Sequence, residues 1–191
     1  MSIVTGSFGN NFVTMSADSM GVDRDGSVNN DIRKIFKRNN VIVGFTGAYA
    51  VPKVLFKEEK YLDLGLNTYN AELFSNGMMK ELGGKIGMDS FVLIGGIGHN
   101  NRIFYSGLDL RNNEIATSGY MESEIRNLVL DPSDSEPLSS KFNKTMEDKL
   151  MNGMNLSINS IISIQDEFIC DISKKSLYVN SNVKNETILI C

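Results

Sequence analysis

Residues 2–18, with the sequence SIVTGSFGNNFVTMSAD, decide the fold, because they predict its first two strands and the turn between them. Apolar residues recur through 3–8 and through 12–18 in the alternating pattern that is typical of strands. The intervening FGNN at 8–11 contains glycine and asparagine, which tight turns favour. The second strand is expected to end at Asp18.

Outward from this stretch, the sequence predicts strands, two helices, strands, two more helices and final strands. This is the order of an α+β layered sandwich in which helices cover two stacked sheets. Pro52 is expected in the first turn of the first helix, where a missing N–H costs little. The buried side of the second helix is expected to carry Tyr69, Leu73, Met78 and Leu82. The expected strands are 3–8, 12–18, 33–37, 41–46, 90–96, 102–107, 114–118, 175–179 and 187–190, and the expected helices are 48–60, 68–82, 139–151 and 157–169.

The composition indicates a single soluble, cytoplasmic domain over residues 1–191. A chain of 191 residues can bury a sizeable core without disulfides or metal. Its two cysteines, Cys170 and Cys191, do not suggest a disulfide framework. The single histidine, His99, leaves almost nothing from which a histidine-based triad or a metal site could be built. We therefore expect neither a metal nor a cofactor.

Charge and hydropathy argue against two classes of partner. The net charge is −4 and no long basic tract occurs, which argues against nucleic acid. No apolar run approaches the roughly 18 residues that span a bilayer, and no signal peptide precedes the first strand, so no membrane is expected. The acidic, turn-rich residues 130–137 predict a surface loop. The glycines at 95–98 lack the full dinucleotide-binding fingerprint, and a strand follows them instead of a helix.

Ser2 is the first candidate for chemistry, because loss of Met1 would place it at the N-terminus. A free α-amine has a pKa of about 7.7–8.0, so an N-terminal serine carries its own general base beside its nucleophilic oxygen. Met-Ser is also an ordinary start for a cytosolic chain, and Ser2 alone does not decide between these interpretations.

Asp18 and Lys34 follow Ser2 by 16 and 32 positions. Ile32, Lys34 and Phe36 share one face of a period-2 strand, so Lys34 is expected to point where the apolar side chains point. The alternatives are a solvated lysine in the basic run at 33–38 and a turn-forming aspartate at the end of a strand.

These intervals resemble those of the proteasome β-subunit family and of its bacterial relative, the heat-shock-locus V peptidase, which share an N-terminal nucleophile, an aspartate and a lysine. The strand VIVGFTGA at 41–48 resembles the family's strand that ends in a glycine pair, with Ala48 replacing the second glycine. The Ser-Gly at 118–119 and the helix that leads to Asp171 resemble later parts of the family pattern. The resemblance covers most of the chain and is strongest over residues 2–50.

The resemblance implies a four-layer αββα sandwich of two stacked antiparallel sheets covered by helices, which is the fold of N-terminal-nucleophile hydrolases. It also implies a peptidase that cleaves unfolded polypeptides inside a homo-oligomeric ring, with an ATP-driven unfoldase as partner. The resemblance implies that Ser2 is the nucleophile, that Lys34 lowers the pKa values of the α-amine and the hydroxyl, and that Asp18 orients Lys34. It implies that the N–H of Gly47 is an oxyanion-hole donor, and that Ser118 and Asp171 orient the α-amine.

Two other functions stay open at this point. A proteasome-like scaffold or assembly protein could keep the fold without proteolysis, and a small-molecule amidase could use the same nucleophile. The departures from the family pattern, which are serine in place of the usual threonine, Ile3 behind it and Ala48 in the glycine pair, keep the scaffold open. The presence of Ser2, Asp18 and Lys34 together favours the peptidase.

Overall fold

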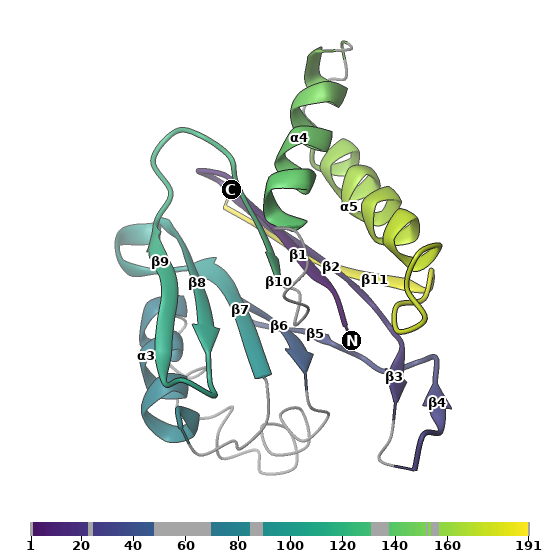
Figure 1. The fold of residues 1–191 in the computed structure, drawn as a ribbon. Coiled ribbons are helices and arrows are strands. Elements are labelled where there is room, and N and C mark those ends of the chain that lie inside the picture. Colours follow the sequence, from purple (N-terminus) through teal and green to yellow (C-terminus); the bar gives the residue numbers. More distant parts are fainter. Residues whose placement is uncertain are drawn as a thin grey trace.

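The computed structural model is a mixed α+β protein with antiparallel sheets (Figure 1). It describes residues 2–22, 25–47, 70–84, 90–130, 138–151, 153 and 157–190. Within these ranges the α-helices are α3 (Ala71–Leu82), α4 (Leu138–Met151) and α5 (Ile158–Ser173). None of these helices has both the length and the apolar character needed to cross a membrane.

The first sheet has the strand order β10-β1-β2-β11. The turn at Gly9 closes the hairpin of β1 and β2, with the Gly9 N–H bonded to the Phe12 carbonyl. The sheet thus joins the two ends of the described chain, because β11 pairs with β2 from Val183 opposite Asp18 onward. Its strands are β1 (Val4–Phe8), β2 (Phe12–Asp18), β10 (Arg126–Leu130) and β11 (Val183–Leu189).

The second sheet is a meander in the order β5-β6-β7-β8-β9. Between β2 and β5 the chain makes the short hairpin of β3 (Gly21–Val22) and β4 (Val28–Asn29), which forms a separate two-stranded sheet. The five strands are β5 (Ile35–Arg38), β6 (Val41–Gly47), β7 (Ser90–Ile97), β8 (Ile103–Asp109) and β9 (Glu114–Tyr120). The turn between β7 and β8 contains a short 3₁₀ helix at His99–Asn101.

The two sheets face each other across a shared apolar cluster. Val13 and Met15 of β2 lie in this cluster with Ile42 of β6 and Leu93 of β7. The approach is close, because a Cβ on Gly95 would lie 2.5 Å from the Phe8 ring and 2.8 Å from Val13. The absence of a side chain at Gly95 therefore helps to set how near the sheets can lie.

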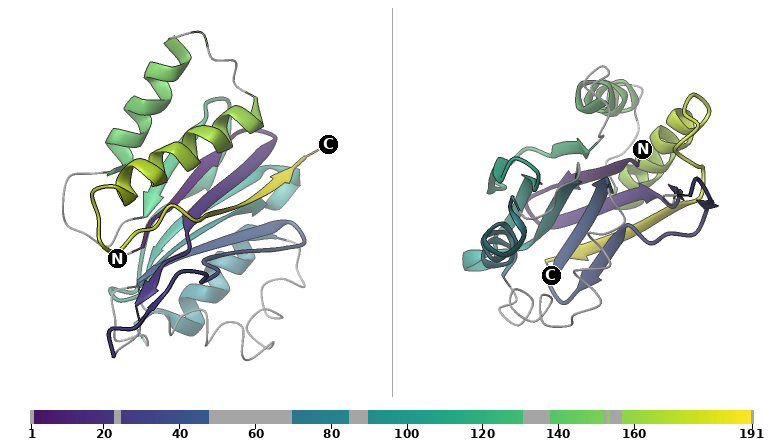
Figure 2. Two further views of the ribbon diagram at one scale, coloured as in Figure 1. Left: turned by 90° about the vertical axis from the view of Figure 1, so that its right-hand side faces the viewer. Right: turned by 60° about the horizontal axis from the view of Figure 1, so that its bottom comes forward.

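The helices cover the outer faces of the sheets, α4 and α5 on the first and α3 on the second (Figure 2). Phe142 of α4 and Phe168 of α5 pack with Ile3 in one cluster. Phe74 and Met78 of α3 pack in another with residues of the second sheet. Asn70 caps α3, accepting from the amides of Glu72 and Leu73 as N-cap residues do.

The structure confirms the predicted strands near 3–8, 12–18, 41–46, 90–96 and 102–107, and the two last predicted helices to within a few residues at each end. It extends the strand near 114–118 to Tyr120, and the last strand starts at Val183 instead of 187. The two short strands β3 and β4 and the edge strand β10 were not predicted. The helix expected at 48–60 and Tyr69 lie outside the described residues. Of the loop expected at 130–137, only Leu130 is described, and it is the last residue of β10.

Two sequence predictions are wrong. The strand expected at 175–179 is a series of turns, in which the Ser176 hydroxyl accepts from the Tyr178 N–H and so competes with strand pairing. Leu73 was expected on the buried side of its helix, yet it is 53% exposed. Ala71, Phe74, Met78 and Leu82 form the buried stripe instead, at the spacing of one helix face.

Candidate active site

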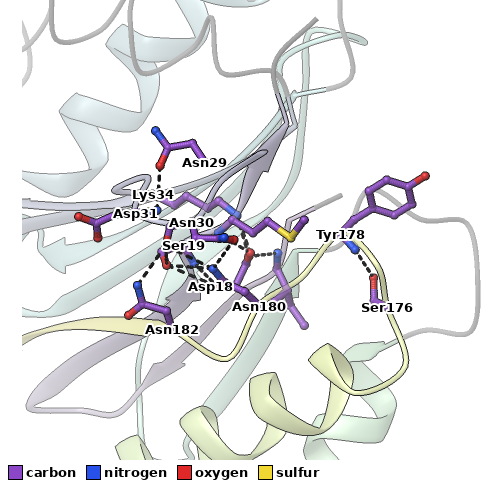
Figure 3. Close-up of polar contacts among 12 residues, drawn as sticks. Asp18, Ser19, Asn29, Asn30, Asp31, Lys34, Ser176, Tyr178, Asn180 and Asn182 are labelled. Carbon is purple, nitrogen blue, oxygen red and sulfur yellow. Dashed lines mark hydrogen bonds and ion pairs between the residues drawn. The ribbon is translucent and has the colours of Figure 1, made fainter. Parts of the chain in front are cut away.

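A buried ion pair joins Asp18, the last residue of β2, to Lys34, which immediately precedes β5 (Figure 3). The Lys34 Nζ lies 2.8 Å from both carboxylate oxygens of Asp18. The two side chains are 6% and 0% exposed. The structure thus brings together two of the residues that the sequence singles out, and it places the lysine inward, as its apolar neighbours predict.

Each oxygen of the Asp18 carboxylate also accepts a hydrogen bond from a backbone N–H. Its Oδ1 accepts from the Ile3 N–H at 2.9 Å, and its Oδ2 accepts from the Met20 N–H at 3.0 Å. These bonds use lone pairs that the ammonium leaves free, so the carboxylate has little freedom to turn. The Ile3 bond ties the carboxylate to the residue that follows Ser2.

Burial of Lys34 lowers the pKa of its ammonium below the ordinary value, and the neighbouring Asp18 carboxylate opposes this shift. Desolvation favours the neutral amine, whereas the carboxylate favours the charged ammonium. The contacts with Asp18 therefore favour the charged form of Lys34.

Ser2 is 7% exposed and directly precedes the tethered Ile3. The Ile3 carbonyl also accepts from the Asp18 N–H, at 3.4 Å. The start of the chain therefore lies against the end of β2, where the ion pair sits. Only Ile3, whose N–H binds the Asp18 carboxylate, would separate a nucleophile at residue 2 from the ion pair along the chain.

Gly47 ends β6 opposite Ser90 of β7, and it is exposed. Its φ is +97°, which lies in the left-handed region that glycine adopts without strain. The residues that follow it, 48–69, lie outside the described part of the chain. Its role as an oxyanion-hole donor stays a prediction.

Ser118 and Asp171 do not join the contacts around the ion pair that the structure describes. Ser118 lies on the edge strand β9 opposite Ser106, and it is exposed. Asp171 lies in the last turns of α5 and pairs with Lys174 at 2.8 Å, with both side chains largely exposed. This ammonium is the main cause that lowers the pKa of Asp171.

Sequence reasoning missed a group of polar side chains next to Asp18, made of Ser19, Asn30, Asn180 and Asn182 (Figure 3). The Ser19 hydroxyl donates to the Asn30 carbonyl at 2.7 Å. Asn180 accepts from the Ser19 N–H at 3.1 Å and donates to the Asn30 carbonyl at 3.3 Å, while Asn182 donates to that same carbonyl at 3.1 Å. Asparagine and serine in short polar stretches are the usual residues of loops, so the sequence alone carries no signal that would have found them.

A pocket of about 820 Å³ lies elsewhere, beside β10 and α4, with Tyr105, Arg126 and Asn143 in its wall. Arg126 in the pocket wall lies opposite Phe8, at the far end of β1 from the ion pair. Leu130, at the other end of β10, lies opposite Val4 near the start of the chain. Within the described ranges, His, Cys, Asp and Glu side chains form no group of three or more that could hold a metal ion.

The chain matches no protein-family model, and it matches no curated protein.

Proposed function

We propose that this protein is a cytoplasmic, proteasome-like N-terminal-nucleophile peptidase that becomes active when Met1 is removed and Ser2 becomes the first residue. The observation that carries the proposal is the buried Lys34–Asp18 pair, which is bonded to the backbone N–H of Ile3 directly behind Ser2. Two facing antiparallel sheets with helices on their outer faces support the finer assignment to a four-layer αββα sandwich.

The proposed reaction begins with the Ser2 hydroxyl. Its oxygen attacks the carbonyl carbon of a peptide bond while the α-amine of Ser2 takes the hydroxyl proton, directly or through a water. The tetrahedral intermediate collapses to an ester on Ser2, and the leaving amine receives the proton. Water then attacks the ester while the α-amine takes a proton from that water. The bond between the acyl carbon and the Ser2 oxygen breaks, the α-ammonium returns the proton to that oxygen, and the acid product leaves.

Lys34 supplies positive charge to this chemistry. A nearby ammonium stabilises the developing alkoxide and keeps the α-amine neutral by like-charge repulsion, so that the amine can act as a base near neutral pH. Asp18 holds this ammonium charged and oriented, with contacts of 2.8 Å to both of its oxygens. In the proposal the N–H of Gly47 binds the oxyanion, a contact worth roughly 2.7–4 kcal/mol in other enzymes.

The substrate, assembly and partner in this proposal come from the family resemblance alone. They are unfolded polypeptide as substrate, a homo-oligomeric ring that encloses the Ser2 sites, and an ATP-driven unfoldase that feeds the ring. Confinement inside a ring would keep an N-terminal nucleophile away from folded cytosolic proteins.

The test combines intact mass with covalent labelling. The purified protein should lack one methionine, and a peptide vinyl sulfone should add one equivalent to Ser2, located by peptide mapping. Ser2→Ala should abolish both labelling and the hydrolysis of unfolded casein. Ser2→Thr should keep both, and Ser123→Ala, at an exposed serine, should leave both unchanged.

Retention of Met1, or labelling that survives Ser2→Ala, would overturn the proposal. Retained Met1 with no hydrolysis would favour the inert scaffold instead. Sedimentation addresses the ring separately, because a particle of several subunits is expected and a stable monomer would contradict that part.

A further inference from the structure

We infer that Asn180 is a positioning residue that fixes the geometry of the Asp18–Lys34 pair by clamping together the two chain segments that carry it; its role in turnover rests on the proposed function. Asp18 is followed directly by Ser19, and Lys34 is preceded at a short distance by Asn30. Between them the chain leaves the body of the protein as the exposed β3–β4 hairpin. The geometry of the pair therefore depends on how the two ends of this excursion are held together.

Asn180 contacts both ends with one amide group. Its Oδ1 accepts from the Ser19 N–H at 3.1 Å, and its Nδ2 donates to the carbonyl and the side-chain oxygen of Asn30, each at 3.3 Å. The direct bonds between the ends, from the Ser19 hydroxyl to Asn30 and from the Ile32 N–H to the Ser19 carbonyl, complete the closure. The amide thus braces a junction one residue from Asp18.

The clamp itself is anchored on both sides. Val179 is 4% exposed and packs in the same cluster as Ile3, whose N–H binds Asp18. Three residues beyond Asn180, Val183 pairs with Asp18 as the first residue of β11. The clamp therefore moves with the core and with β2, and it holds the Asn30 end against them.

The chemistry of the position requires an amide. A side chain that accepts from the Ser19 N–H and donates to the Asn30 carbonyl needs an acceptor and a donor on one short, planar group. Aspartate keeps the acceptor and loses the donor, and alanine loses both. Asparagine is the shortest side chain that carries an uncharged donor and an acceptor on two separate atoms, so it can bond to Ser19 and to Asn30 at the same time.

The test reads the pair directly, so that it does not depend on activity. In uniformly ¹⁵N-labelled protein near neutral pH, the Lys34 ammonium should give a resolved ¹H–¹⁵N signal, because its protons are buried and bonded to Asp18. Asn180→Ala should broaden this signal beyond detection and speed amide exchange at Ser19 and Met20 at least tenfold. In turnover of unfolded casein, kcat should fall while KM stays unchanged, because the substrate gains or loses no contact.

Two variants keep the result interpretable. Asn70→Ala removes the N-cap of α3, far along the chain from the pair, and should lower stability without changing the Lys34 signal. Asn180→Asp is nearly isosteric and guards against misfolding of the alanine variant. It should keep the Ser19 amide protected and still broaden the Lys34 signal, because the bonds that Nδ2 donates to both oxygens of Asn30 and to the Ser19 hydroxyl are lost.

An unchanged Lys34 signal in a folded Asn180→Ala variant, or equal loss of the signal in Asn70→Ala, would overturn the inference. These outcomes are separate from a failure of the proposed function. The protein could lack peptidase activity and still lose the Lys34 signal on Asn180→Ala. In that case Asn180 positions the ion pair as inferred, and only its role in turnover is refuted.

Discussion

Ile3 and Lys34 bind the same carboxylate oxygen: the backbone N–H of Ile3 and the Nζ of Lys34 both donate to Oδ1 of Asp18, at 2.9 Å and 2.8 Å. A single atom therefore links the start of β1 to the buried ammonium. Loss of the charge on either member of the ion pair changes the electrostatic field one residue away from Ser2. The first prediction follows from this link.

Lys34→Met should lower turnover by roughly 10²- to 10³-fold, the loss that is typical when one group stabilising developing negative charge is removed. It should also lower the free energy of unfolding by about 3–5 kcal/mol, because the buried Asp18 carboxylate loses its counter-ion. Initial rates on unfolded casein and urea denaturation measure the two effects. Lys37→Met is the matched control, since Lys37 is exposed and its ammonium binds the Thr187 carbonyl.

The double variant Asp18→Asn/Lys34→Met should recover much of the lost stability and none of the activity, because no buried charge is then left uncompensated. If Lys34→Met hydrolyses casein as fast as Lys37→Met does, Lys34 has no role in the reaction.

Gln165→Leu should destabilise the fold by about 1–3 kcal/mol, the cost of leaving buried polar groups without partners. Gln165 is fully buried, and its Nε2 donates to the Ser7 hydroxyl and the Thr14 carbonyl, each at 3.2 Å. Urea denaturation followed by circular dichroism suits a chain without tryptophan. Glu167→Gln on the same helix, where the carboxylate pairs with the exposed Lys149, should stay within about 0.5 kcal/mol of the wild type.

Asp166 predicts a pH dependence of stability. Partial burial raises the pKa of its carboxyl above the ordinary value of 3.8, against a hydrogen bond from the Ser16 hydroxyl that lowers it. A carboxyl with a raised folded-state pKa contributes stability below its unfolded pKa, and this contribution is lost as pH rises through the folded-state value. Asp166→Asn should therefore gain stability relative to the wild type as pH rises from below 3.8 through that window, with a constant difference above it. Urea midpoints across this range that show no change in the difference would contradict the assignment.

Asp171→Asn and Ser118→Ala should leave casein turnover unchanged, in contrast to the roles that the family resemblance implies for them. Asp171 is engaged by Lys174 in an exposed ion pair, and Ser118 lies on the exposed edge strand β9. Parallel rate measurements with Lys34→Met calibrate the assay. A marked loss of activity in either variant would show that the residue acts at the site in the working enzyme.

Local patterns in the sequence were sufficient for most strands and for the inward orientation of Lys34, whereas its partnership with Asp18 was implied by the family resemblance. Alternation over 12–18 predicted β2, and the apolar neighbours of Lys34 predicted that its side chain points inward, where the structure has it buried. Both inferences depend only on residues a few positions apart. The edge strand β10 was not predicted because its strand character comes from pairing with β1, more than a hundred residues earlier.

The surroundings of the pair could not be predicted for the same reason. Asn180 bonds to Ser19 although 161 positions separate them in the sequence. The residues next to Asn180 do not indicate that its side chain contacts the end of β2. Asp171, which the sequence pattern singled out on this part of the chain, lies on the solvent side of its helix. Which strand end the turns after α5 meet depends on the pairing of β11 with β2, and this pairing joins residues far apart in the chain.

The pairing of β11 with β2 has a consequence for how the protein is made. Thr14 and Thr187 bond across these neighbouring strands although 173 residues separate them in the chain. On a ribosome, β1 and β2 emerge before β11, so one edge of β2 stays unpaired until β11 has been synthesised. The loop that carries Asn180 arrives with that same late strand. A nascent chain therefore cannot assemble the complete surroundings of Asp18 and Lys34, or begin the chemistry proposed for Ser2, before Asn180 and β11 have emerged.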